Sequence, residues 1–513
     1  MHAARTSGIL LHLTSLPGPH GSGDFGAAAY HFVDWLKSAG QGLWQLLPLN
    51  PAGPGHSPYM SPSAFAIDPQ LIDLADLVQR GWLDADLLDR QRHEMALSDR
   101  YRIDFARVVP FRMQMLKSAA QRFLQLRRAG AGSEQAQTDR NGDVGFMAFC
   151  DAQADWLDDY ALFMAIAERW PQASWADWPS PLARRIPEVL NRISQDWADD
   201  IEFWKFSQWI AHRQWQSVKR YANDNGVRIV GDVPIFIAPH SADVWAHPEL
   251  FDLTPQLQPR VVAGVPPDYF SATGQLWGNP LYRWARHHEQ GFAWWIARVR
   301  ACLQQADIVR IDHFRGFAEY WEVAADAATA ATGTWRPGPA AALFEALQKV
   351  LGELPIIAED LGVITPDVTA LRQQFRLPGM RVLQFAFGDD AGNAYLPHNY
   401  EQQTVVYTGT HDNDTSAGWF DQASAHERDS VQTYLKSDGS QIGWDLIHCA
   451  SQSVAAIAIY PLQDVLDLGS EARMNRPGVA DGCWNWRFDW DQVQAWHGRR
   501  LSEISMAHGR HRI

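Results

Sequence analysis

Eight short apolar runs, each bounded by turn-forming residues, are spaced along the chain. Most are almost continuously apolar, a pattern typical of parallel strands that are covered on both faces. They occupy residues 8–13, 43–49, 227–236, 307–314, 355–359, 380–387, 404–409 and 454–462. Helical patterns separate many of them, as at residues 27–38, 291–304, 341–351 and 366–375. This alternation predicts an α/β fold, specifically a (β/α)8 TIM barrel.

Two segments are too long to be simple connections of such a barrel. Residues from about 68 to 226 are mostly helical in pattern, which predicts a helical insertion between the second and third strands. Residues from about 237 to 290 are rich in proline, glycine and aromatic residues, which predicts a loop-rich insertion that forms a cleft wall. We therefore expect residues 1–513 to form a single catalytic barrel with two insertions.

The charge and cysteine content exclude several classes of protein. With 44 basic and 59 acidic residues, the chain has a formal net charge of −15, which disfavours nucleic acid and anionic membrane as partners. The four cysteines form no CxxC pair, so a disulfide scaffold or zinc ribbon is not indicated. No apolar run approaches the roughly 20 residues of a membrane span, and His12 interrupts the apolar patch near the start. We expect a cytoplasmic protein with no evident obligate protein partner.

Residues 21–26 match the pattern GxGxxG and lie between a predicted strand and a predicted helix, as in a dinucleotide-binding fingerprint. That fingerprint also needs an acidic residue about 20 positions later to hold the ribose. No Asp or Glu occurs between Asp34 and Asp68. We therefore expect these glycines to shape a barrel loop and not to bind a nicotinamide cofactor.

Acidic residues stand at or just beyond the ends of four predicted strands: Asp232, Asp312, Glu359 and Asp412. In a TIM barrel these ends converge on one face, where active sites are built. An acid after a strand can also simply cap the following helix. Four acids gathered on one face repel each other, however, and such clusters are typical of catalysis or metal binding. The pattern favours a catalytic site at this face.

Arg310 and Asp312 lie two residues apart on a predicted strand, so their side chains point the same way. An adjacent arginine lowers the pKa of an aspartate, which predicts an ionised Asp312 suited to nucleophilic attack, although a structural ion pair is the alternative. Glu359 follows an apolar stretch, and burial opposite an ionised Asp312 would raise its pKa. An ionised nucleophile facing a protonated acid is the arrangement of a retaining glycosidase.

The remaining motifs argue against a metal centre and for a sugar-binding loop. Residues 411–414 contain metal-ligand types, but Ala417 and Ala423 stand where a calcium loop needs Gly and Glu. No HExxH, P-loop or GxSxG motif occurs, and we expect no metal and no cofactor. Trp277, in a glycine-rich loop, and Tyr59, after the second strand, could each cover the face of a sugar ring. Ordinary loop packing is the alternative for both.

Taken in order, these motifs resemble the 4-α-glucanotransferases, also called amylomaltases or disproportionating enzymes, a family of α-amylase-related glycoside hydrolases (family 77). The resemblance covers almost the whole chain, from Gly8 to about Phe488. It is carried by GDVPIF (231–236), GVPPDYFS (264–271), GQLWGNP (274–280), RIDHFRG (310–316), IAEDLG (357–362), TGTHDNDT (408–415), MNRPG (474–478) and WNWRF (484–488).

The resemblance implies a role for each matching residue. Asp312 would be the nucleophile and Glu359 the acid/base, while Asp412 would hold sugar hydroxyls in the transition state. Further residues are implied to bind substrate, either by bracing the reacting glucose or by lining neighbouring sugar subsites: Arg310, His411, Tyr59, Asp232, Asp268, Gln275 and Trp277.

The implied substrates are maltooligosaccharides and other α-1,4-glucans. The implied activity is transfer of a glucan segment from a donor to the 4-hydroxyl of an acceptor sugar, through a covalent glycosyl-enzyme and with retention of configuration. Two alternatives remain at this point. An amylase-like hydrolase could use the same barrel, and a non-catalytic glucan-binding protein could use the same cleft, although a binding protein would not need the clustered acids.

Overall fold

The computed structural model describes residues 5–95, 99–129, 136–267 and 272–511, with the backbone alone for residues 136–143. Eight parallel strands form its central sheet, in the spatial order β10-β11-β12-β1-β2-β3-β6-β9. These strands are β1 (Thr6–Leu10), β2 (Leu43–Gln45), β3 (Arg228–Pro234), β6 (Ile308–Asp312), β9 (Ile356–Ala358), β10 (Gly379–Val382), β11 (Thr404–Tyr407) and β12 (Ile457–Pro461). Each corresponds to one predicted apolar run.

The sheet closes on itself between β9 and β10. Ala358 N–H donates a hydrogen bond of 2.9 Å to the carbonyl of Pro378, and Met380 N–H donates one of 2.6 Å to Oδ1 of Asp360. A Cβ atom at Gly379 would lie 2.4 Å from a carboxylate oxygen of Asp360, so only glycine permits this close approach. The predicted TIM barrel is confirmed.

Helices cover the outside of the barrel between most of its strands, because their apolar faces need the sheet for burial. The helices expected from the sequence are present with closely similar bounds: α1 (Ala27–Ser38), α12 (Ala293–Gln305), α13 (Ala340–Leu351) and α14 (Pro366–Gln374). Later helices complete the ring: α15 (Ser416–Gln422), α16 (Ala425–Leu435), α17 (Ile442–Gln452), α18 (Leu462–Val465) and α19 (Ala495–Ala507). Between β10 and β11 the chain forms only short 3-10 turns.

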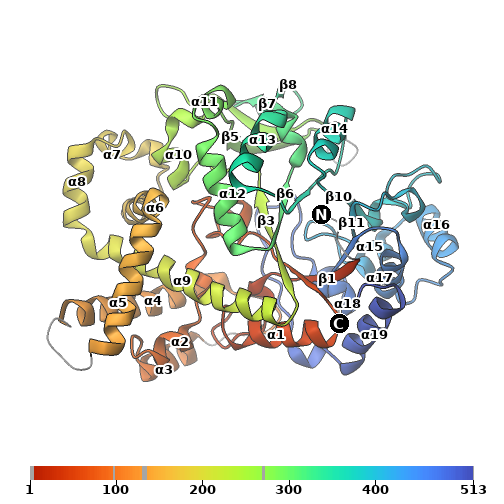
Figure 1. Cartoon of the computed structure of the whole chain (residues 1–513), viewed down its shortest axis with the longest axis horizontal. Helices are drawn as coiled ribbons and strands as arrows, with labels where there is room; N and C mark the ends of the chain where they lie inside the picture. Colours follow the sequence, from red (N-terminus) through yellow and green to blue (C-terminus); the bar gives the residue numbers. More distant parts are fainter. Residues whose placement is uncertain (1–4, 96–98, 130–135, 268–271, 512–513) are drawn as a thin grey trace.

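The long segment between β2 and β3 is helical and extends away from the barrel, to the left in Figure 1. Its helices are α2 (Leu74–Gln79), α3 (Ala85–Met95), α4 (Phe105–Ala129), α5 (Ala136–Ala152), α6 (Ala154–Ala167), α7 (Ser180–Ala183), α8 (Pro187–Asp196) and α9 (Ala198–Asp224). Helix α9 packs aromatic side chains against α4 and α6 and leads directly into β3. It thereby joins the helical segment to the barrel.

A second, four-stranded antiparallel sheet lies beside the barrel, in the order β5-β4-β7-β8. Its strands are β4 (Val261–Val265), β5 (Gln275–Pro280), β7 (Glu319–Ala324) and β8 (Thr334–Pro337). No pattern in the sequence predicted this sheet, and β4 and β5 fall within the segment expected to be rich in loops. That segment also contains helices α10 (Ala242–Ala246) and α11 (Trp284–Glu289). Within the described residues, no helix combines the length and apolar character that crossing a membrane requires.

Candidate active site

The acidic residues predicted from the strand ends meet at the carboxyl-terminal end of the barrel. Asp232 lies in β3 and Asp312 ends β6, and these neighbouring strands pair so that Asp232 stands opposite Arg310. Glu359 directly follows β9, which pairs with β6 so that Ile311 stands opposite Ala358. Asp312 and Glu359 are therefore equivalent positions on adjacent strands, which brings their carboxyl groups to the same mouth of the barrel.

Arg310 is the buried cation that joins two of these acids. Its Nη1 donates a hydrogen bond of 2.6 Å to Oδ2 of Asp232, and its Nη2 donates one of 2.9 Å to Oδ1 of Asp312. The side chains of Arg310 and Asp232 are 4% and 0% exposed, whereas that of Asp312 is 31% exposed. Of the two acids on this guanidinium, only Asp312 can therefore reach a substrate in the cleft.

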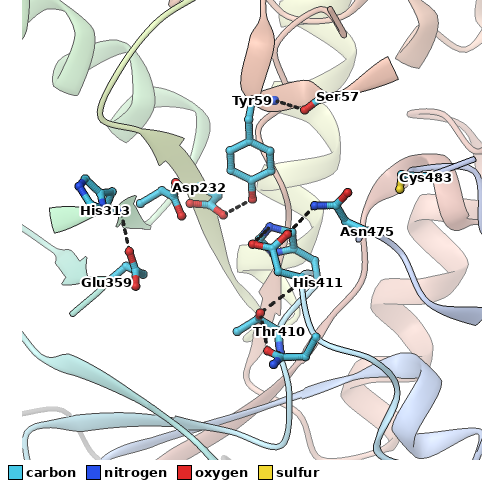
Figure 2. A network of polar contacts seen from close by, with 12 residues as sticks. Ser57, Tyr59, Asp232, His313, Glu359, Thr410, His411, Asn475 and Cys483 are labelled. Carbon is cyan, nitrogen blue, oxygen red and sulfur yellow. Dashed lines mark hydrogen bonds and ion pairs between the residues drawn. The ribbon is translucent and has the colours of Figure 1, made fainter. Parts of the chain in front are cut away.

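Asp232 is fully engaged by protein groups. Besides the ion pair with Arg310, it accepts a hydrogen bond of 2.7 Å from the hydroxyl of Tyr59. Figure 2 shows this bond at the centre of the polar network. The resemblance implies a subsite role for Asp232, and in the structure its buried carboxylate holds Tyr59 and Arg310.

Glu359 is held by main-chain donors. Its Oε2 accepts a hydrogen bond of 2.6 Å from the N–H of His313, and its Oε1 accepts one of 2.9 Å from the N–H of Leu361. His313 has a φ of 53°, an uncommon left-handed conformation for a residue with a side chain. This turn directly after Asp312 points the His313 N–H at Glu359 (Figure 2).

The electrostatics separate the two facing acids. Burial, with repulsion from Asp312, raises the pKa of Glu359 to about 8, so this carboxyl is protonated at pH 7. Arg310 lowers the pKa of Asp312, as expected, but the overall shift of that pKa is upward. Burial, together with the negative charges of Asp232 and Asp412, outweighs the guanidinium. The direct contact with Arg310 still favours Asp312 over Glu359 as the site of the negative charge.

Asp412 lies across the site, after β11, and is held in part by Asn475 and Arg473, two residues for which the sequence predicted no role. The side-chain amide of Asn475 donates a hydrogen bond of 2.6 Å to Oδ1 of Asp412. Arg473 donates one of 2.6 Å to the Asp412 carbonyl. His411 Nε2 lies 3.4 Å from Oδ2 of Asp412, and Figure 2 shows His411 and Asn475 together on the opposite side of Asp232 from Glu359.

Aromatic rings flank these carboxylates on two sides. Tyr59 and His411 are stacked with ring centroids 5.1 Å apart, and Trp484 packs against both. On the other side Trp277, in β5, meets the ring of His313 edge-on at 4.8 Å. The indole N–H of Trp277 donates a hydrogen bond of 3.2 Å to Oε1 of Gln275, so these two predicted residues act together.

The structure thus gathers all the predicted site residues that it describes, while Asp268 lies outside the described residues. Asn475, Arg473, His313 and Trp484 are additions. Three of them, His313, Asn475 and Trp484, lie in the motifs at 310–316, 474–478 and 484–488, although a motif does not identify the partner of a residue. In the described part of the chain, no group of three or more His, Cys, Asp or Glu side chains is placed to hold a metal ion.

The predicted glycine loop at residues 21–26 is packed into the protein. Asp24 is buried and forms an ion pair of 2.7 Å with Arg112. The guanidinium of Arg487 donates hydrogen bonds to the carbonyls of Gly18 and Gly21. A Cβ atom at Gly23 would lie 2.0 Å from the carbonyl oxygen of Leu13. These contacts fit a glycine loop that shapes the barrel.

Comparison with known proteins gives one consistent result. Residues 11–492 match the model of glycoside hydrolase family 77, described as 4-alpha-glucanotransferase. The 4-alpha-glucanotransferase of Synechocystis sp. is 49% identical over 99% of this chain and 98% of its own length. That of Thermus thermophilus is 47% identical over 99% of both chains.

Solved structures agree. The amylomaltase from Streptococcus agalactiae in complex with acarbose superimposes with a TM-score of 0.93 at 37% identity, covering 99% of this chain and 100% of that one. The amylomaltase from Corynebacterium glutamicum, at 19% identity and a TM-score of 0.77, covers 98% of this chain and 75% of that one and shares the fold.

Proposed function

The chain belongs to the 4-alpha-glucanotransferase family, whose members transfer α-1,4-glucan segments by a retaining double displacement, and we propose which of its residues perform each step. Asp312 is the nucleophile, Glu359 the acid/base and Asp412 the carboxylate that holds sugar hydroxyls in the transition state. The observation that carries this assignment is the hydrogen bond between the main chain directly after Asp312 and the carboxyl of Glu359, at 2.6 Å.

In the first step, a carboxylate oxygen of Asp312 attacks the anomeric carbon of the donor sugar. The bond from this carbon to the bridging oxygen breaks, and the departing 4-oxygen takes the proton of Glu359. A retaining pair of carboxyl groups stands about 5–5.5 Å apart, a separation that suits adjacent strands. The pKa of about 8 keeps Glu359 protonated for this step at pH 7.

In the second step, the 4-hydroxyl of an acceptor sugar attacks the same carbon and Glu359 takes the hydroxyl proton. The ester bond to Asp312 breaks, so both acids return to their starting states and the configuration is retained. Water in place of the sugar would give hydrolysis. Trp277 and Gln275 form a wall beside His313 that suits an acceptor sugar, and we propose that an occupied wall excludes water.

The remaining site residues position these groups. Arg310 keeps Asp312 charged, Asp232 holds both Arg310 and Tyr59, and His411 and Asn475 orient Asp412. We propose maltooligosaccharides and longer α-1,4-glucans as substrates, without an obligate protein partner. Asp268, in a motif that matches the family, is proposed to contribute to a sugar subsite.

Incubation with maltotriose tests the activity. Transfer yields glucose and longer oligosaccharides while the number of reducing ends stays constant, whereas a steady rise in reducing ends would indicate a hydrolase and contradict the proposal. The variant Asp312→Asn should lose both transfer and hydrolysis but still bind maltooligosaccharides. Turnover at the original rate in this variant would refute the assignment of the nucleophile.

A further inference from the structure

A hollow on the outer surface of the protein is lined by side chains that the catalytic site does not use. It has a volume of about 500 Å³, within the range of ligand-binding pockets. It lies where α5, the start of α6, α9 and the end of α12 come together, and Figure 1 shows α9 running from the helical segment to the barrel. Its lining includes Phe149, Gln153, Trp209, His212, Arg213 and Gln216.

The hollow is remote from the carboxylates. Gln304, on its rim, lies at the end of α12 and precedes the start of β6, whereas Asp312 ends the same strand. The strand from Ile308 to Asp312 alone spans roughly 13 Å. A ligand in the hollow therefore lies near the amino-terminal end of the barrel strands, away from the catalytic mouth.

The lining is aromatic and amide-rich, and it carries no free charge. The guanidinium of Arg213 lies over the ring of Trp209, 5.1 Å from its centroid, and pairs with Asp76 at 2.7 Å. Burial lowers the pKa of His212 to about 4, so this imidazole is neutral at pH 7. A surface of this kind disfavours ionic ligands and suits a neutral molecule.

Hydrogen-bonding capacity on this surface is left for a ligand. The buried Nε2 of His212 has no hydrogen-bond partner within the described part of the chain, which is uncommon for a buried polar atom. Side-chain amides of Gln153, Gln216 and Gln304 line the same hollow. The Gln153 oxygen accepts from the Trp156 indole and the Gln216 amide donates to the Gln304 carbonyl, but each of these two amides keeps its other group, a donor in Gln153 and an acceptor in Gln216. Hydroxyl groups, which also donate and accept, are the natural complement to such amides.

We propose that this hollow is a second binding site for α-1,4-glucan, which retains long glucan chains on the enzyme during transfer. The rings of Phe149 and His212, with centroids 5.1 Å apart, provide an apolar surface for the sugar C–H groups. The proposal rests on the proposed function for the identity of the sugar. A chain held at both sites gains affinity from the high effective concentration of its second segment.

Calorimetric titration with maltoheptaose tests the binding. In the Asp312→Asn background, which removes turnover, we expect two binding sites per chain. Adding Gln216→Ala or Phe149→Ala should weaken one of them by about tenfold or more and leave the other unchanged. The matched control is Gln348→Ala, at an exposed position on α13, and it should leave both sites intact.

Kinetics with substrates of different length provide the second readout. In the otherwise unaltered enzyme, the hollow variants Gln216→Ala and Phe149→Ala should raise KM for amylose several-fold with kcat unchanged. They should leave maltotriose transfer unchanged. Gln216→Ala removes only an exposed contact, its 2.9 Å bond to the carbonyl of Gln304, so it tests the proposal even if Phe149→Ala fails to fold. A single binding site, or a second site insensitive to Gln216→Ala, would overturn the proposal. Loss of maltotriose transfer in the unaltered enzyme would instead overturn the proposed function.

Discussion

Replacing Asp232 by asparagine removes one charge from the centre of the active site and should change both the stability of the protein and the pH dependence of its activity. The Asp232 carboxylate is 0% exposed and lies 2.6 Å from a guanidinium nitrogen of Arg310, which is 4% exposed. Asparagine keeps the shape and one acceptor oxygen, so it can preserve the bond from Tyr59. The variant therefore tests the charge more than the packing.

The loss of stability follows from this burial. Removing one partner of a buried ion pair costs about 3–5 kcal/mol, and the lower end applies here because Arg310 keeps Asp312 as a partner. The entropy of unfolding is roughly 2.1 cal/mol/K per residue for 513 residues. A cost of about 3 kcal/mol then lowers Tm by about 3 °C, which differential scanning calorimetry can measure.

The pH dependence should move in one direction. The negative charge of Asp232 helps to raise the pKa of Asp312, and Arg310 acts in the opposite direction. The asparagine variant removes the negative charge of Asp232, and Asp312 then becomes the only acid paired with Arg310. Both changes lower the pKa of Asp312. The acid limb of kcat/KM for maltotriose, which reports ionisation of the nucleophile, should therefore shift to lower pH by roughly one unit.

Asp24→Asn is the matched control for the loss of a buried charge. Asp24 and Arg112 form an ion pair of 2.7 Å with side-chain exposures of 5% and 1%, in the glycine loop and away from the catalytic acids. This variant should lower Tm at least as much, because the other hydrogen-bond acceptors of Arg112 among the described residues are carbonyl groups, and it should leave the acid limb in place. If Asp232→Asn lowers Tm while its acid limb stays or moves to higher pH, the electrostatic reasoning is refuted.

Three further predictions concern the other site residues. Because the pKa of Glu359 is about 8, kcat/KM should fall as the pH rises through about 8. The variant Glu359→Gln should lose this alkaline fall in kcat/KM together with most of the activity. A kcat/KM that stays constant at alkaline pH in the unaltered enzyme would contradict this prediction. Asn475→Ala removes the 2.6 Å hydrogen bond to Asp412, and losing a hydrogen bond to a charged group costs about 1.5–3 kcal/mol. The variant should therefore lower kcat roughly tenfold or more, with a smaller effect on KM. An effect on KM alone would contradict a transition-state role for Asp412. Trp277→Ala should raise the ratio of hydrolysis to transfer in a combined reducing-end and product assay, and an unchanged ratio would show that the ring does not exclude water.

The barrel could be predicted from the sequence because its signals are local. Most of the eight strands are buried on both faces, which leaves an almost continuous apolar run in the sequence. The small sheet escaped prediction because its strands are only partly buried and unusual in composition: β5 contains Gly278 and Pro280, residues that strands disfavour. Strand β5 pairs with β4 across an intervening loop, and no short segment of the sequence reveals this pairing.

The catalytic acids also carry local signals in the sequence, whereas the residues that hold them in place do not. Asp312 ends a strand, whereas Glu359 and Asp412 come after strands, and the convergence of strand ends in a barrel is enough to bring the three acids together. Asn475 is 63 residues from Asp412 and follows no strand, so nothing local marks it as the partner. The net pKa of Asp312 also depends on charges from two other strands, which the spacing of Arg310 and Asp312 cannot reveal.

The hydrogen-bond and ion-pair partners of the acids explain how several carboxylates can occupy one barrel mouth and perform different tasks. Asp232 and Asp312 share the single guanidinium of Arg310, and burial of Asp232 leaves only Asp312 to meet the substrate. Glu359 contacts main-chain N–H groups that carry no formal charge, so burial and the facing Asp312 leave it protonated. Since a guanidinium and peptide groups differ in charge, the choice of partner for each acid sets its protonation state. That choice, more than the acids themselves, distinguishes the nucleophile from the proton donor.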